Sequence, residues 1–379
     1  MLRGFFSKIV VVFLLLGVLA PQFLLAQEVH QDFEERVQAE VLSIEEEYER
    51  PITGTGATAV VQESRIKLLN GEKEGEIVDL ISEKVALEVG DTIYVNRIID
   101  ISGNEYITFA DFERRPVLLF VSVLFVLMLL FFSGWQGLRA LLSLFGSIGA
   151  IFFLLIPALL AGYDPALTSV AIAAIVMVFV LFGTHGINPR TIIAFAGTYS
   201  AVVVTGIIAY FSVDLMRLTG FSNDASVYLN FATNGQLDLA GLLLGGIIIG
   251  ILGVLDDVSI TQASVVQELK HANSALRFSE LYASAIRVGR DHIGSLVNTL
   301  ALAYVGVSLP LILLYAKTES SFMLSLNQEV IAAEVIRIII GSIGLILAVP
   351  LTTLFAAWWF DNHEVDSIDN SSHHHHHHH

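Results

Sequence analysis

The 379-residue chain contains no cysteine. This absence excludes disulfide bonds, thiol catalysis and thiolate metal sites together. The chain also lacks the patterns His-Glu-x-x-His, Gly-x-Ser-x-Gly and Gly-x-Gly-Asp, which carry hydrolytic chemistry in other proteins. We therefore do not expect an enzyme, and no pattern in the sequence predicts a cofactor or a bound metal.

Charged residues are scarce as well. They make up 15% of the chain, whereas 54% of its residues are hydrophobic and the mean hydropathy is +0.70. A soluble domain of this size carries more charge and has no repeated apolar runs of about twenty residues. The composition therefore predicts a multipass integral membrane protein surrounded by a lipid bilayer. The final run His373–His379 is a purification tag and has no part in the function.

The first 26 residues have the layout of an export signal. Arg3 and Lys8 precede an apolar stretch from Ile9 to Leu25, and Ala26 ends an acceptable cleavage site. The same stretch is near the lower length limit for a helix that stays in the membrane as an anchor. We expect residues 1–26 to be a signal peptide or an anchor helix, and both alternatives export the segment that follows.

Residues 27–115 have the texture of a small β domain. Short alternating runs such as Glu40–Ile44 and Asp91–Asn96 have strand periodicity, and Asn70-Gly71 marks a hairpin turn. Four to six such strands predict a barrel of the OB or SH3 type. The segment holds 21 acidic and 9 basic residues and no stripe of aromatic and basic side chains. Nucleic acid is therefore not expected as a partner, and the acidity serves either solubility or the binding of an envelope protein.

Residues 116–361 are predicted to form an all-α membrane bundle, and residues 362–379 form a tail with the tag. Each expected span approaches the roughly 20 apolar residues that cross the hydrocarbon core. The seven expected spans are 117–133, 140–161, 167–183, 192–211, 239–255, 293–315 and 338–360. Small-x-x-x-small patterns such as Gly241-x-x-x-Gly245 allow close helix packing, and a homo-oligomer is compatible with them.

Basic residues favour one orientation of this bundle. More of them fall in the connections on one side, which the positive-inside rule assigns to the cytoplasm. That side holds Arg139, Arg190, Lys270, Arg277, Arg287 and Arg290, and the short outer connections hold Arg217, Lys317 and Arg337. We therefore expect residues 27–115 to be extracytoplasmic and the C-terminus to be cytoplasmic.

Two adjacent acids, Asp256 and Asp257, end the otherwise apolar fifth span. If the helix continues past them, Asp257, Thr261, Ser264 and Glu268 form one polar stripe. Ionisable residues at membrane depth are costly and mark ion or proton pathways. The alternative is that the pair lies hydrated at the membrane edge.

Other polar clusters lie close to this pair in the sequence. One opens the sixth span, where Asp291 and Asn298 share a helix face. Residues 262–291 are expected to form an inner amphipathic segment, whose helix 279–286 lies along the membrane surface or docks on the bundle. The predicted ion, proton or substrate path comprises Asp256, Asp257, Thr261, Gln262, Asp291, His292, Asn298 and Thr299, with His185, Asn188, Arg190 and Arg290 as secondary candidates.

Several of these segments together resemble a known family. The turn Thr184–Asn188, the segment Leu255–Gln262, the opening Gly289–Ile293 and the segment Asn298–Tyr304 resemble the YibE/YibF family of bacterial multipass membrane proteins. The resemblance covers most of the chain, including the turns of the β domain. It implies a place in the bacterial inner membrane, and the family has no established activity. The acidic span is also similar to the proton-relay helices of RND exporters and SecD/SecF-type proteins, which is an analogy only.

These features predict a membrane transporter or permease of unknown substrate, coupled to protons or cations through the acidic pair of the fifth span. The alternative is a non-transporting scaffold or envelope assembly factor that acts through its β domain.

Overall fold

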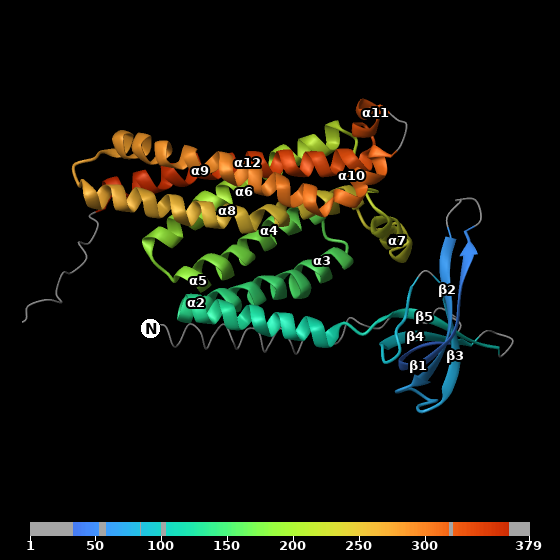
Figure 1. Ribbon diagram of the computed structural model, residues 1–379. Helices are drawn as coiled ribbons and strands as arrows, with labels where there is room; N and C mark the ends of the chain where they lie inside the picture. The colour runs from blue at the N-terminus through green and yellow to red at the C-terminus, as the bar shows by residue number, and fades with distance from the viewer. Residues whose placement is uncertain (1–32, 53–57, 84, 100–103, 318–320, 364–379) are drawn as a thin grey trace, which may run out of the picture. The chain divides into compact units, whose positions relative to one another are not determined.

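The computed structural model describes residues 33–52, 58–83, 85–99, 104–317 and 321–363 (Figure 1). The predicted signal or anchor helix, residues 1–26, and the tail with the tag lie outside the described residues. The chain divides into two compact units, Met1–Met128 and Leu129–His379.

The first unit contains a closed five-stranded barrel, drawn in blue in Figure 1. Its strands follow the order β1-β2-β3-β5-β4, and β1 also pairs with β4 to close the barrel. Neighbouring strands are antiparallel except β3 and β5, which are parallel. The strands are β1 Phe33–Pro51, β2 Thr58–Leu68, β3 Ile77–Glu83, β4 Thr92–Ile99 and β5 Glu105–Phe112. The predicted small barrel is confirmed as a closed barrel of five strands.

The barrel is held by an apolar core, as a domain without disulfides requires. Strand alternation sends one set of side chains inward, where they are no more than 1% exposed. These core residues are Val37, Ala39, Val41, Ile66, Leu68, Leu80, Leu87, Ile93 and Val95. The predicted hairpin turn at Asn70-Gly71 is fixed by a hydrogen bond of 2.8 Å from the Gln38 N–H to Asn70 Oδ1. Gly71 has φ +93°, a conformation that favours glycine.

One charged side chain, Arg97, is buried in the barrel wall and is only 6% exposed. Its Nε donates to Glu105 at 2.6 Å, and its Nη1 donates to Glu35 at 3.0 Å and to Glu72 at 3.1 Å. Hydrogen bonds from Lys73 and Arg97 lower the pKa of Glu105. The cluster ties β1, β4, β5 and the β2–β3 turn together.

Acid is expected to loosen the barrel. Hydrogen bonds from Arg115 and Tyr94 lower the pKa of Glu113 to about 2, and the pKa of Glu105 is lowered as well. A carboxyl with a lowered folded-state pKa stabilises the fold fully above its unfolded value of about 4.3, and that stabilisation is lost as the pH falls through the folded value. Hydrogen exchange of barrel peptides, corrected for intrinsic pH effects, should rise between about pH 5 and pH 2. A Glu113→Gln variant should show a smaller rise, and an equal rise would contradict this assignment.

The second unit is a bundle of helices. Helix α2, Arg115–Ala150, starts in the first unit and continues through η2, Ile151–Leu155, a π-helical stretch, into α3, Ile156–Leu160. The other elements are α4 Pro165–Met177, the π-helical η3 Val178–Phe182, α5 Gly183–His185, α6 Pro189–Leu215, α7 Asp224–Ala232, α8 Leu239–Ala272, α9 Phe278–Val307, α10 Leu309–Ala316, α11 Phe322–Leu326 and α12 Glu329–Asn362.

Among the described residues, five helical stretches are long and apolar enough to cross a membrane. Helices α9 and α10 pass the same test together although they are bent by 67°, which gives up to six spans. The five are 115–160, 165–185, 189–215, 239–272 and 329–362. This set of helices is consistent with a membrane protein. Gly134, with φ 53° and ψ −132°, interrupts the first stretch between the two spans predicted there, so the count of seven stays a prediction.

Helices α6, α8 and α12 form the centre of the bundle, with α9 and α4 packed against them. Apolar residues of α8 such as Ile247, Ile251 and Leu255 are no more than 1% exposed. Helices α6 and α12 approach closely because Gly197 has no side chain. A Cβ placed there would lie 2.7 Å from the Cα of Thr352.

Replacing Gly197 with Ala is therefore expected to destabilise the bundle. The added methyl meets backbone rather than the end of a flexible side chain, and overpacking of this kind costs about 1–3 kcal/mol. Gly246→Ala is a matched control on α8, because a Cβ at Gly246 has nothing within 4 Å. The unfolding temperature of the purified protein should fall for the first variant and stay or rise for the second. Equal temperatures would show that α6 and α12 are not closely packed at this point.

The inner amphipathic segment differs from the expectation in one respect. Helix α8 runs without a break past the acidic pair to Ala272, as the polar stripe requires. Residues 279–286 do not form a helix of their own, since they are the first turns of α9. Leu281 and Ala285 are fully buried, so these turns dock on the bundle, the second of the two alternatives.

Candidate functional site

The two acids of α8 differ in their surroundings because adjacent helix positions point about 100° apart. Asp256 is buried at 7% exposure, and its Oδ1 accepts a 2.8 Å hydrogen bond from the N–H of Asp257. The side chain of Asp257 is exposed. Within the described residues, neither carboxylate forms an ion pair.

Opposite Asp257 lies the turn that joins α5 to α6. Gly186 ends α5 with φ 77° and ψ 177°, a conformation open to glycine. Asn188 then caps α6: its Oδ1 accepts from the Thr191 N–H at 3.0 Å, and its Nδ2 donates to the His185 carbonyl at 3.0 Å. The Gly-Ile-Asn-Pro-Arg sequence thus places His185 and Arg190 at the two ends of one turn.

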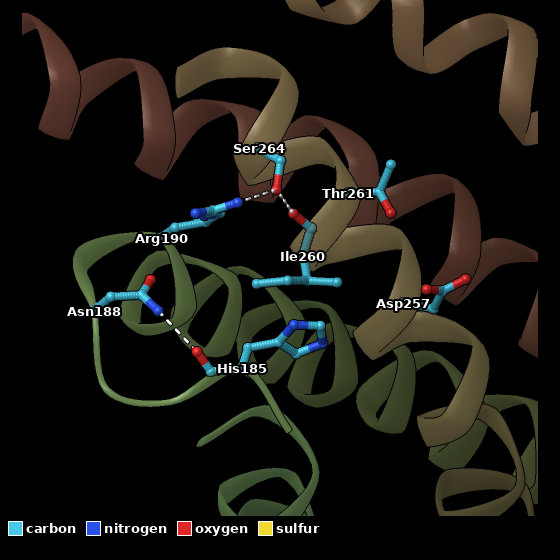
Figure 2. Close-up of a pocket in the computed structure, with 7 residues that line it drawn as sticks. All are labelled: His185, Asn188, Arg190, Asp257, Ile260, Thr261 and Ser264. Carbon is cyan, nitrogen blue, oxygen red and sulfur yellow. Dashed lines mark hydrogen bonds between the residues drawn. The ribbon is translucent and has the colours of Figure 1, made fainter. Parts of the chain in front are cut away.

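This turn and α8 line an open cavity of about 290 Å³. It is lined by His185, Asn188, Arg190, Asp257, Ile260, Thr261 and Ser264. Figure 2 shows the imidazole of His185 beneath Ile260, between Asn188 on one side and Asp257 on the other. The predicted polar stripe of α8 and the secondary candidates of the turn therefore meet in one site.

The cavity carries opposite charges that are not paired with each other. Arg190 Nη1 donates to Ser264 Oγ at 3.3 Å, and Ser264 Oγ donates to the Ile260 carbonyl at 2.8 Å. Within the described part of the chain, the carboxylate of Asp257 accepts no hydrogen bond. Such a site can hold a charged solute, and its carboxylate and imidazole are groups that exchange protons.

The predicted path residues of α9 do not line this cavity. Asp291, His292, Asn298, Thr299 and Arg290 are all exposed on that helix. The polar face of α9 is not turned toward the α5–α6 turn. The spacing of these residues predicted that they share a helix face, but it could not predict which neighbouring element that face meets.

Helices α8 and α9 nevertheless run alongside each other in opposite directions. Gln262 contacts Ala285 near one end, and the hydroxyl of Tyr304 lies beside Gly250 near the other. The acidic pair and Asn298 both fall between these two contacts. That α9 contributes to the same path stays a prediction.

Gln262 has a different place from the one expected. It is 4% exposed, and its Nε2 donates to the Ala285 carbonyl at 3.0 Å and to Thr353 Oγ1 at 2.8 Å. A second bond of 3.1 Å joins Ser259 and Thr352. Gln262 thus connects α8, α9 and α12 inside the bundle and does not face the cavity.

A further polar cluster was missed in the sequence. It lies at the break between α9 and α10, where Ser308 Oγ donates to Glu334 at 3.1 Å and Arg337 Nη1 donates to Glu334 at 2.7 Å. The available signals were Pro310, which follows the break, and the i, i+3 spacing of Glu334 and Arg337. In the described ranges, no three His, Asp or Glu side chains lie together as a metal site would require.

Comparison with known proteins gives one match. The family model described as YibE/F-like protein matches residues 121–362, which is more than half of the chain. No curated protein and no solved structure matches the chain. The matched range begins within α2 and includes every residue that lines the cavity. It does not include the barrel, so the family match does not extend to the turns of the β domain. The extent of this match shows that the chain belongs to the family of YibE/F-like proteins.

Proposed function

We propose that the protein is a membrane transporter or permease coupled to protons or cations, with the cavity between the α5–α6 turn and α8 on its path. One observation carries this proposal. Asp257, His185 and Arg190 line a cavity in a bundle whose long helices are mostly apolar. Ionisable groups in such helices are costly, and proteins keep them where solutes or protons pass.

Asp256 gives this path a second acidic group next to the cavity. Its side chain is buried and has no cationic partner within the described residues. A buried charge without a partner is unfavourable, and a proton or small cation that reaches Asp256 neutralises it. Asp257, which is exposed, is the group that such an ion meets first.

The direct test is ion-coupled flux in liposomes that contain the purified protein. A pH gradient imposed across the vesicle membrane should collapse faster than in empty vesicles, as a trapped pH-sensitive dye reports. Equal rates, tested also with sodium and potassium gradients, would contradict coupled transport.

For the topology we propose seven spans in the bacterial inner membrane. Gly134 separates the first two, α9 and α10 together form one broken span, the barrel is extracytoplasmic and the C-terminus is cytoplasmic. The excess of basic residues in the connections on one side supports this orientation.

Because the chain has no cysteine, single cysteines test this topology without background. Lys67 on the barrel and Asn273 in the α8–α9 connection are both exposed. A cysteine at Lys67 should react with a membrane-impermeant maleimide in intact spheroplasts, and one at Asn273 should react only after lysis. Labelling of both, or of neither, in intact cells would overturn the orientation.

The scaffold function keeps one argument in its favour. The barrel has its own core and lies outside the matched family range, which is compatible with a binding role separate from the helical bundle. Deletion of residues 33–113 separates the two proposals. If the protein is a transporter, the deletion variant should retain flux through the helical bundle. If it is a scaffold, the full-length protein should show no flux, and the deletion variant should lose the cellular function.

A further inference from the structure

We propose that the cavity between the α5–α6 turn and α8 binds a small zwitterion, with the ligand's carboxylate at Arg190 and its ammonium group at Asp257. This inference rests on the proposed function in one respect, which is that the cavity is taken as the substrate site. Its ligand class comes from the charges themselves.

The first argument is that both charges have unused bonding capacity. A guanidinium has five N–H donors, and the hydrogen bond of Arg190 to Ser264 occupies one of them. The carboxylate of Asp257 accepts none within the described residues. By contrast, the bundle's Glu334 and Arg337 meet at 2.7 Å. Arg190 and Asp257 face one cavity of about 290 Å³ and do not meet.

The second argument is their separation. Arg190 bonds to Ser264, and Asp257 lies two turns earlier on α8, about 10 Å along the helix axis at 1.5 Å per residue. The 3.3 Å hydrogen bond keeps the guanidinium beside Ser264, so a ligand that meets both Arg190 and Asp257 has its two charges separated along the helix. That separation suits an amino acid whose amine is several methylene groups from its carboxylate. It is longer than the span of an α-amino acid.

The third argument is the lining between the two charges. Ile260 lies between Arg190 and Asp257 in Figure 2 and offers an apolar contact for methylene groups. At the Arg190 end, the first turn of α6 adds its partial positive charge, which favours a carboxylate. The carboxylate, the methylene groups and the ammonium group of the ligand thus meet Arg190, Ile260 and Asp257, respectively.

Ligands of a single charge fit this wall less well. A free anion at Arg190 leaves Asp257 unpaired in the same cavity and is repelled by it. A free cation at Asp257 leaves Arg190 unpaired. A single ligand that carries both charges satisfies both ends at once.

The experiment is isothermal titration of the purified full-length protein with 4-aminobutanoate, butanoate and butylamine. We expect 4-aminobutanoate to bind at least about tenfold more tightly than either singly charged analogue, since each charged end contributes a charge-assisted hydrogen bond. Glycine should bind weakly because its charges are too close together. Similar affinities for all four compounds, or no binding of any, would overturn the proposal.

Two variants assign the ends. In Arg190→Gln the preference for 4-aminobutanoate over butylamine should disappear, and in Asp257→Asn the preference over butanoate should disappear. Glu268→Gln, on the same stripe of α8 but outside the cavity, is the matched control and should bind as the parent does. Gel filtration confirms that each variant is folded. Unchanged preferences in both folded variants would place the ligand elsewhere and overturn the proposal.

The outcomes also separate this inference from the proposed function. Ion-coupled flux without any binding of 4-aminobutanoate overturns the zwitterion alone. Binding that follows both variants as described, with no flux of any ion or of labelled ligand, upholds the site and overturns transport.

Discussion

Asp257→Asn is expected to abolish ion-coupled flux in proteoliposomes. Asparagine keeps the size of the side chain and removes the charge, so the cavity retains its shape and loses the one carboxylate that the described lining residues contain. In general acid–base catalysis a positioned proton-exchanging group contributes roughly 100-fold or more, and we take this factor for the proton step of transport. Flux should therefore fall by roughly that factor, measured with a pH-sensitive dye inside the vesicles.

Three further variants make this result specific. Glu268→Gln changes an exposed carboxyl of the same helix outside the cavity and should leave flux unchanged. Asp256→Asn removes the buried acid and should reduce flux as strongly as Asp257→Asn, if both acids carry the coupled ion. Asp291→Asn tests the predicted contribution of α9, and only a strong effect there would bring that helix into the path. Full flux in Asp257→Asn would remove the basis of the transport proposal.

Arg97→Met should be the most damaging single change in the barrel. It leaves Glu35, Glu72 and Glu105 without their shared partner at a buried position. Breaking a buried ion pair by removing one partner costs about 3–5 kcal/mol. We expect the low end of this range, about 3 kcal/mol, because Glu72 is 69% exposed and its charge remains hydrated.

The matched control is Arg50→Met. Arg50 and Glu83 form an ion pair at 2.7 Å, but the two side chains are 55% and 51% exposed, so its loss should cost less than about 1 kcal/mol. Hydrogen exchange of the barrel strands at neutral pH measures both variants in the full-length protein. Equal protection in the two would mean that burial of Arg97 contributes nothing to the barrel.

Local patterns were sufficient to predict several elements. Strand alternation and the Asn70-Gly71 turn predicted a small barrel. The spacing of Asp257, Thr261 and Ser264 predicted one polar stripe on condition that the helix continues past the acidic pair, as α8 does. These features depend on residues close together in the sequence. Their geometry follows from the periods of strands and helices alone.

What sequence patterns missed depends on contacts between distant segments. No sequence pattern singled out Arg97, because its partners Glu35 and Glu72 come from other parts of the barrel. Gln262 sat on a polar stretch and was assigned to the path, but packing of α8 against α9 and α12 turns it inward. Sequence spacing also did not show that His185 and Arg190, rather than the polar residues of α9, would share a cavity with Asp257. The packing of α6 on α8 determines this arrangement.

The bonds around Gln262 have a mechanical consequence. They fasten α8 to α9 and α12, and the close approach at Gly197 fastens α6 to α12. The cavity wall formed by α8 and the start of α6, which carries Arg190, therefore belong to one stiff group of helices. Among the described residues, no side-chain hydrogen bond joins α5, Gly183–His185, to α12. Helix α5 also follows a π-helical turn, a geometry less stable than the regular helix. If the cavity opens and closes during a cycle, we expect His185 to move while Arg190 and Asp257 keep their spacing.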